Sequence, residues 1–157
     1  MKLRAIVDYL YIYLPSHFRY DIVFVESFDE MCRRIYQQYP SYFRNLKAVK
    51  KYYMTAIQDG CNRGNKSYFT NNEIPAYLKT HRTRHTGLPL AVAATPILFN
   101  RNIRIYNPNA VVFAILHEIG HNIMYIYNEN LCDRFALEWC EKLKRRGFFK
   151  RLGRRLS

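Results

Sequence analysis

Residues 117–121 form a His-Glu-x-x-His motif inside a strongly apolar segment, and this placement constrains the fold more than any other feature. Asn107 and Pro108 predict the start of a helix, with Asn as the N-cap and Pro in the first helical turn. The apolar run 110–116 leads directly into the motif, so this helix is expected to be largely buried. The chain must therefore fold around a core helix that carries two histidines and a glutamate.

The spacing of the histidines predicts a metal site. Positions i and i+4 share a helix face, so His117 and His121 can direct both imidazoles at one cation. Glu118 lies beside the first ligand, where its carboxylate can accept a proton from metal-bound water. Without a metal, the apolar helix would bury three polar groups at a cost of roughly a few kcal/mol each. We therefore expect one zinc ion per chain, in preference to a core helix whose histidines are satisfied by hydrogen bonds alone.

A catalytic zinc site needs a third protein ligand. No histidine follows His121, which excludes any pattern with a downstream histidine ligand. Asn128 predicts the N-cap of a further helix, from Glu129 to about residue 144, on which Glu129 and Asp133 share a face. Either carboxylate could bind the metal. We assign Glu129 as the ligand and Asp133 as the acceptor of a hydrogen bond from a ligand imidazole, although the helix dipole alone also favours an acid at this position.

The rest of the chain predicts a mixture of helices and short strands. Ser27 is a candidate N-cap, and Glu30 would complete a capping box with it. Asn100 and Arg101 could turn a hairpin between two of the strands. The expected helices are 2–14, 28–38 and 45–58, and the expected strands are 20–25, 90–94, 96–99 and 102–106.

Size and composition predict a single domain, residues 1–141, with its own core. The chain has 157 residues, of which 49% are hydrophobic. Its four cysteines are widely spaced without a CxxC pair, so buried reduced thiols are expected. The first residues resemble a signal peptide, but Asp8 interrupts the apolar run and no small-residue cleavage site follows. We expect a soluble, cytoplasmic protein whose first helix is amphipathic.

Residues 142–157 form a basic C-terminal tail. They hold eight of the 25 basic residues of the chain and no acidic residue, so most of the net charge of +13 lies here. On a helix, Phe148, Phe149, Leu152 and Leu156 would share a face opposite the cations, as in helices that lie on anionic membranes. The same cations could instead bind the phosphates of a nucleic acid, or the tail could be solvated and partly disordered.

Three further side chains are candidates for contacts to the substrate or the transition state. His81 and His85 form a second pair at a spacing of four residues, in a segment rich in Thr and Arg. The neighbouring positive charges would repel a cation, so an exposed basic loop near the cleft is favoured over a second metal site. Tyr125 follows the motif helix closely and is the third candidate.

The segments HEIGHN (117–122) and ENLCDRFALEW (129–139) resemble the ImmA/IrrE-type metallopeptidases. Their second motif has the form E-x-x-A-(N/D)-x-F-A. Glu129, Asp133, Phe135 and Ala136 match it, and Cys132 stands where the family usually has alanine. The resemblance covers about residues 102–141, and we expect no counterpart of the helix-turn-helix part of some relatives in these 157 residues. The gap between His121 and Glu129 requires the active-site helix to end soon after His121.

The resemblance implies an α+β, zincin-like fold. In it, a small and mostly antiparallel sheet packs against the His-Glu-x-x-His helix and the ligand helix, and the strand at 102–106 borders the cleft. It also implies a zinc metalloendopeptidase that cleaves a protein substrate, often a transcriptional repressor of a phage or mobile element. The alternative is a non-catalytic, zinc-stabilised module that binds nucleic acid or an anionic membrane through its basic tail.

Overall fold

The computed structural model describes residues 3–62 (only the backbone for 55–62), 74–79, 91–102, 107–126 and 128–157. In this part, two short 3-10 helices, η1 (Ser16–Phe18) and η2 (Ala76–Leu78), accompany six α-helices and three strands. The α-helices are α1 (Leu3–Ile12), α2 (Phe28–Gln38), α3 (Leu46–Asn62), α4 (Pro108–Met124), α5 (Glu129–Arg145) and α6 (Phe148–Leu156). The strands are β1 (Ile22–Val25), β2 (Ala91–Val92) and β3 (Ile97–Asn100). The predicted α+β class is confirmed.

The sheet has the order β1-β3-β2 and is mixed. β1 runs parallel to β3, from Ile22 opposite Ile97 to Val25 opposite Asn100, whereas β2 is antiparallel to β3 over two residue pairs. Among the described strands, the expectation of a mostly antiparallel sheet is therefore wrong. The chain between β1 and β3 contains α2 and α3, and such a long crossover permits parallel pairing, whereas residues 93–96 allow only an antiparallel hairpin. The strand expected at 102–106 lies almost entirely outside the described residues.

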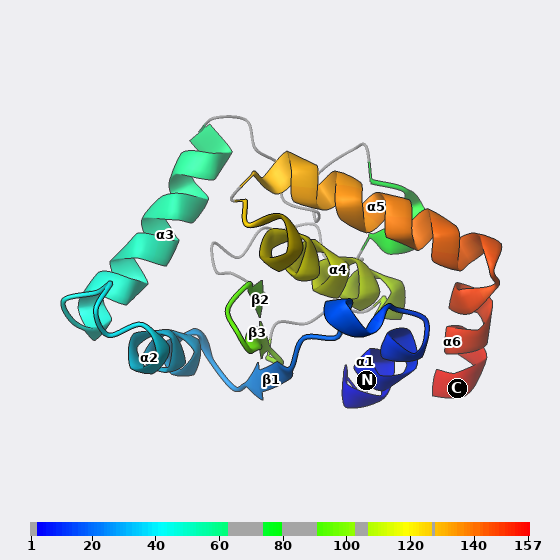
Figure 1. Ribbon diagram of the computed structural model, residues 1–157, viewed down its shortest axis with the longest axis horizontal. Helices are drawn as coiled ribbons and strands as arrows, with labels where there is room; N and C mark the ends of the chain where they lie inside the picture. Colours follow the sequence, from blue (N-terminus) through cyan, green and yellow to red (C-terminus); the bar gives the residue numbers. More distant parts are fainter. Residues whose placement is uncertain (1–2, 63–73, 80–90, 103–106, 127) are drawn as a thin grey trace.

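The central strand β3 separates two apolar cores. Ile97 and Phe99 point into the larger core, which α1, α4, α5 and α6 share, while Leu98 points into a smaller core with α2 and α3. This alternation follows from the two-residue period of a strand. Figure 1 shows α4 in the centre of the helices that surround the larger core, with α5 alongside it and α1 next to α6. Helix α3 projects away from these helices.

The two helices that carry the candidate site begin where the sequence predicts. The side chain of Asn107 caps α4 by accepting a hydrogen bond from Asn109 N (3.0 Å), and that of Asn128 caps α5 by accepting one from Leu131 N (3.1 Å). The Nδ2 atom of Asn107 also donates to Tyr77 O and Lys79 O, which ties the start of α4 to η2. Both N-cap predictions are confirmed.

The turn between α4 and α5 is short, as the sequence requires. α4 ends at Met124, and Tyr125 then adopts a left-handed conformation with φ of 51°. This backbone geometry reverses the chain at once, so that α5 begins at Glu129 and packs along α4.

The cap of α2 differs in one detail from the predicted capping box. The Ser27 hydroxyl accepts a hydrogen bond from Glu30 N (3.0 Å), as predicted. The Glu30 carboxylate accepts from Glu26 N (2.7 Å), one residue before the N-cap, instead of from Ser27 N.

The C-terminal residues form a packed helix. Phe148 and Leu152 on α6 are both 0% exposed and belong to the larger core, and Phe149 packs against Tyr77 with ring centroids 5.3 Å apart. Gly147 has a φ of 75°, which allows the chain to turn sharply between α5 and α6. Residues 148–156 therefore contribute their apolar face to the domain and direct their cations outward.

The structure also bears on the predicted state of the cysteines and on whether a helix could span a membrane. Cys32, Cys132 and Cys140 are buried free thiols, as expected, and the side chain of Cys61 lies outside the described part. Within the described residues, none of the helices alone combines the length and the apolar character needed to cross a membrane. α4 and α5 together meet both requirements but are bent by 118°.

Candidate metal centre

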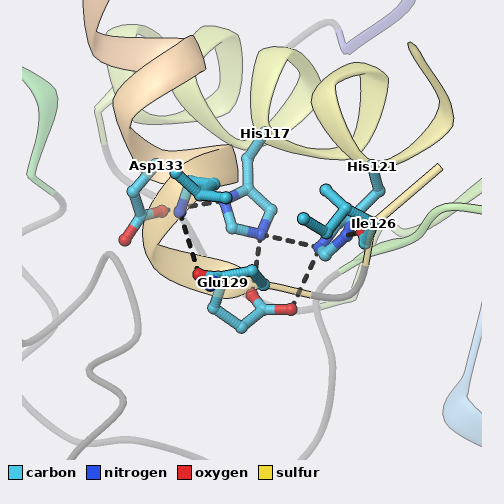
Figure 2. A network of polar contacts seen from close by, with 7 residues as sticks. His117, His121, Ile126, Glu129 and Asp133 are labelled. Atoms are coloured by element: carbon cyan, nitrogen blue, oxygen red, sulfur yellow. Dashed lines mark hydrogen bonds and ion pairs between the residues drawn. The ribbon is translucent and has the colours of Figure 1, made fainter. Parts of the chain in front are cut away.

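Three donor atoms from α4 and the first turn of α5 converge on one point (Figure 2). The Nε2 atom of His117 lies 2.7 Å from one carboxylate oxygen of Glu129, and the Nε2 atom of His121 lies 3.0 Å from the other. The two Nε2 atoms are 3.2 Å apart. His117, His121 and Glu129 therefore form a cluster that could hold a metal ion.

The opposite nitrogen of each imidazole has a fixed acceptor. His117 Nδ1 lies 2.7 Å from Asp133 Oδ1, and His121 Nδ1 lies 2.7 Å from the main-chain oxygen of Ile126. A carboxylate and a carbonyl only accept hydrogen bonds, so we infer that each Nδ1 carries the proton. In the neutral rings, both Nε2 lone pairs then point inward at the Glu129 carboxylate.

This arrangement fits a divalent metal. Two imidazole lone pairs and a carboxylate repel one another unless a cation lies between them, and this donor set occurs in catalytic zinc sites. Metal–ligand bonds of about 2.0–2.1 Å in a tetrahedron place the ligand atoms about 3.3 Å apart. The distances of 2.7, 3.0 and 3.2 Å are slightly shorter, so the cluster needs only a small expansion to admit an ion.

The pKa values describe the charge of the cluster in the absence of metal. Burial alone would lower the pKa of both histidines, but hydrogen bonds override it. Those to Asp133 and Glu129 raise the pKa of His117 to about 10, and those to Cys132 and Glu129 raise the pKa of His121 to about 11. Burial would raise the pKa of Glu129, yet its hydrogen bonds to both imidazoles hold that pKa far below the usual range. Without a metal, the raised pKa values therefore favour the protonated form of both imidazoles.

Glu118 lies on α4 immediately after His117 and is partly buried. Burial raises the pKa of its carboxyl to about 7, and the positive charges of His117 and His121 oppose this rise. The side chain is thus close enough to the cluster to be influenced by its charge. A carboxyl that titrates near neutral pH can both accept and release a proton.

The packing of α5 on α4 fixes the donors. His117 and Asp133 are each 4% exposed, so their hydrogen bond is shielded from water. A Cβ atom at Gly120 would lie 3.0 Å from Cδ1 of Phe135, which shows how closely the helices approach beside the cluster. Oδ2 of Asp133 is buried and has no hydrogen-bond partner among the described residues.

The sequence identified the side chains of this cluster but not the main-chain contact between His121 and Ile126. The carbonyl of Ile126 could not be foreseen, because the left-handed turn at Tyr125 that presents it is formed by a residue type that rarely adopts such a turn. Tyr125 itself is 92% exposed and does not join the cluster. His81 and His85 lie outside the described residues.

Comparisons with protein-family models, with curated proteins and with solved structures found no match. The likeness to the ImmA/IrrE-type metallopeptidases and to the zincin fold thus remains an expectation from the sequence motifs.

Proposed function

We propose that the chain is a zinc-dependent metallopeptidase that hydrolyses a peptide bond in a protein substrate. The observation that carries this proposal is the convergence of His117 Nε2, His121 Nε2 and the Glu129 carboxylate beside Glu118. Two histidines and a glutamate are the ligands of several catalytic zinc sites, in which the fourth position is left to water or substrate.

Each residue of the cluster has a distinct role in this proposal. Zinc would lower the pKa of a coordinated water towards neutrality and polarise the substrate carbonyl. Asp133 and the Ile126 carbonyl hold the two imidazoles in the tautomer that presents Nε2 to the ion. Glu118 accepts the proton of the attacking water and passes it to the leaving amine.

The number of donors favours a catalytic over a purely structural site. Structural zinc sites in proteins are closed by four protein ligands, whereas three side chains converge within the described part of this chain. Glu118 lies near the donors but is not one of them. A carboxylate in this place can transfer protons at an open catalytic site, whereas a closed structural site needs no such group. These points support the peptidase over the zinc-stabilised binding module. The sequence resemblance further suggests a regulatory repressor as the substrate.

The test compares the chain with its Glu118→Gln variant after expression in the same cells. Protein N-termini that appear with the unaltered chain are identified by mass spectrometry. We expect Glu118→Gln to retain about one zinc per chain but to reduce these new N-termini by roughly a hundredfold or more.

Glu138→Gln is the matched control, because Glu138 is an exposed residue of α5 that undergoes the same chemical change. This variant should retain both zinc and cleavage. The proposal fails if the unaltered chain, loaded with zinc, creates no new N-termini, or if Glu118→Gln creates the same ones.

A further inference from the structure

The corner where α5 meets α6 concentrates the positive charge of the protein. All basic residues of this corner are exposed, and residues 142–157 contain no acid. They are Lys142, Lys144, Arg145, Arg146, Lys150, Arg151, Arg154 and Arg155, and we call this set the basic corner. None of the ion pairs formed within the described part of the chain uses one of these cations. Their charge therefore remains available to a partner.

Aromatic rings position several of these cations without neutralising them. The Arg146 guanidinium lies over the ring of Tyr13 (4.9 Å to the centroid), and Lys142 Nζ lies over Trp139 (4.8 Å). Arg151 donates a hydrogen bond to the Tyr13 hydroxyl at 3.1 Å. Rings hold a cation through their electron-rich faces and leave its charge unpaired. Aromatic side chains thus position Lys142, Arg146 and Arg151 of the basic corner.

A hollow at this corner brings aromatic and cationic groups together. It has a volume of about 540 Å³ and lies between the end of α1 and the C-terminal part of α5. Tyr13 and Trp139 line it together with Lys142, Arg145 and Arg146. A second hollow of about 340 Å³ shares Lys142 and Arg145 with it and continues along α5. The second hollow is also lined by Glu138 and Glu141, so the hollow beside Tyr13 and Trp139 is the more cationic of the two.

The burial of the apolar face of α6 argues against a membrane as the partner. A helix that inserts into the membrane surface needs an exposed apolar face. Phe148 and Leu152 are 0% exposed, because they already pack in the larger core. What the corner offers to a partner is cations and aromatic rings.

We infer that the basic corner binds single-stranded nucleic acid. Proteins that bind single strands without sequence preference combine a cationic groove along the backbone with aromatic side chains on which bases stack. Lys142, Arg145 and Arg146 would contact phosphates, and a base would enter the hollow between Tyr13 and Trp139. This inference rests on the charge and shape of the corner, so it stands whether or not the metal centre is catalytic.

The test uses the full chain and an oligothymidine of about 16 nucleotides. Trp139 is the only tryptophan of the chain, so its fluorescence reports binding at this hollow directly. We expect saturable quenching at about 50 mM salt and an affinity that falls steeply as salt is added. Arg145→Glu combined with Arg146→Glu should weaken binding by roughly tenfold or more, because two phosphate contacts become repulsive.

Two further double variants test whether binding depends on the basic corner or only on the net charge of the protein. Lys150→Glu with Arg154→Glu alters exposed positions of α6 and should also weaken binding by several-fold. Lys47→Glu with Lys51→Glu makes the same change in net charge on the exposed side of α3 and should weaken binding by less than about threefold.

Three results would overturn the inference. The first is the absence of saturable quenching by the oligothymidine. The second is equal weakening by the α3 variant and the corner variants, which would indicate general charge attraction. The third is tighter binding to vesicles rich in phosphatidylserine, or to a duplex, without a change in Trp139 fluorescence.

Discussion

The Nδ1 atom of His117 lies 2.7 Å from Oδ1 of Asp133, and both side chains are almost fully buried. This contact links the centre of α4 to α5 and sets the orientation of one side chain of the candidate metal cluster. Because the carboxylate fixes the tautomer and increases the basicity of the imidazole, its effect should extend to the affinity for a metal ion.

Asp133→Asn should therefore lower zinc affinity by about tenfold to a hundredfold. The amide oxygen can still accept the hydrogen bond from His117 Nδ1, but the negative charge that strengthens the ligand is lost. Competition with a chromophoric chelator measures the change. Glu138→Gln again provides the control, since that residue is exposed on the same helix. An unaltered affinity in Asp133→Asn would show that the buried contact has no influence on the metal.

Zinc binding should release about two protons per ion at pH 7. The metal-free pKa values of about 10 for His117 and about 11 for His121 mean that both rings are protonated at this pH. An ion requires both Nε2 lone pairs, whereas Glu129 is already ionised and contributes no proton. Affinity should thus rise with pH by roughly a hundredfold per unit until the pH approaches these values. Calorimetry in buffers of different ionisation enthalpy counts the protons, and a release close to zero would contradict this charge state.

Gly120→Ala should destabilise the protein by about 1–3 kcal/mol and weaken metal binding. The new Cβ would lie 3.0 Å from Cδ1 of Phe135, so that ring must move or α5 must shift together with Glu129. Gly153→Ala is the contrasting change, because nothing lies within 4 Å of a Cβ at that position on α6. It should stabilise the protein by up to about 1 kcal/mol, as alanine favours helix. Denaturant unfolding and zinc competition measure both variants, and equal effects would contradict the close packing at Gly120.

Phe148→Ala should lower the free energy of unfolding by about 3–5 kcal/mol. Phe148 is fully buried and stacks on Tyr9 with ring centroids 5.2 Å apart, so its loss leaves a cavity in the larger core. Arg154→Ala, at an exposed position of the same helix, should change the stability by less than about 0.5 kcal/mol. A small effect of Phe148→Ala in chemical denaturation would mean that α6 is not part of the cooperative unit.

The sequence predicted the local features of the site well. Asn107 and Asn128 mark the helix starts because the N-cap interaction involves residues only two or three positions apart. The spacing of His117 and His121 likewise reports a shared helix face, and Glu129 comes to the same point because the chain turns directly after α4.

Contacts between residues far apart in the chain could not be predicted from the sequence. The pairing of Ile22 with Ile97 joins residues far apart in the chain, and strand propensity does not specify a partner or a direction. An amphipathic pattern such as that of α6 also does not say whether its apolar face meets a protein core or a membrane. In the structure Phe148 is buried against Tyr9, so the apolar face of α6 packs in the protein core.

The X-ray absorption spectrum of zinc in the purified 157-residue chain tests the central claim most directly. We predict a first shell of nitrogen and oxygen only, at about 2.0–2.1 Å, with outer scattering from two imidazole rings. His121→Ala should lose one imidazole contribution. A sulfur shell at about 2.3 Å, which would indicate cysteine ligation, or a chain that binds no zinc when the ion is supplied, would contradict the assignment of His117, His121 and Glu129.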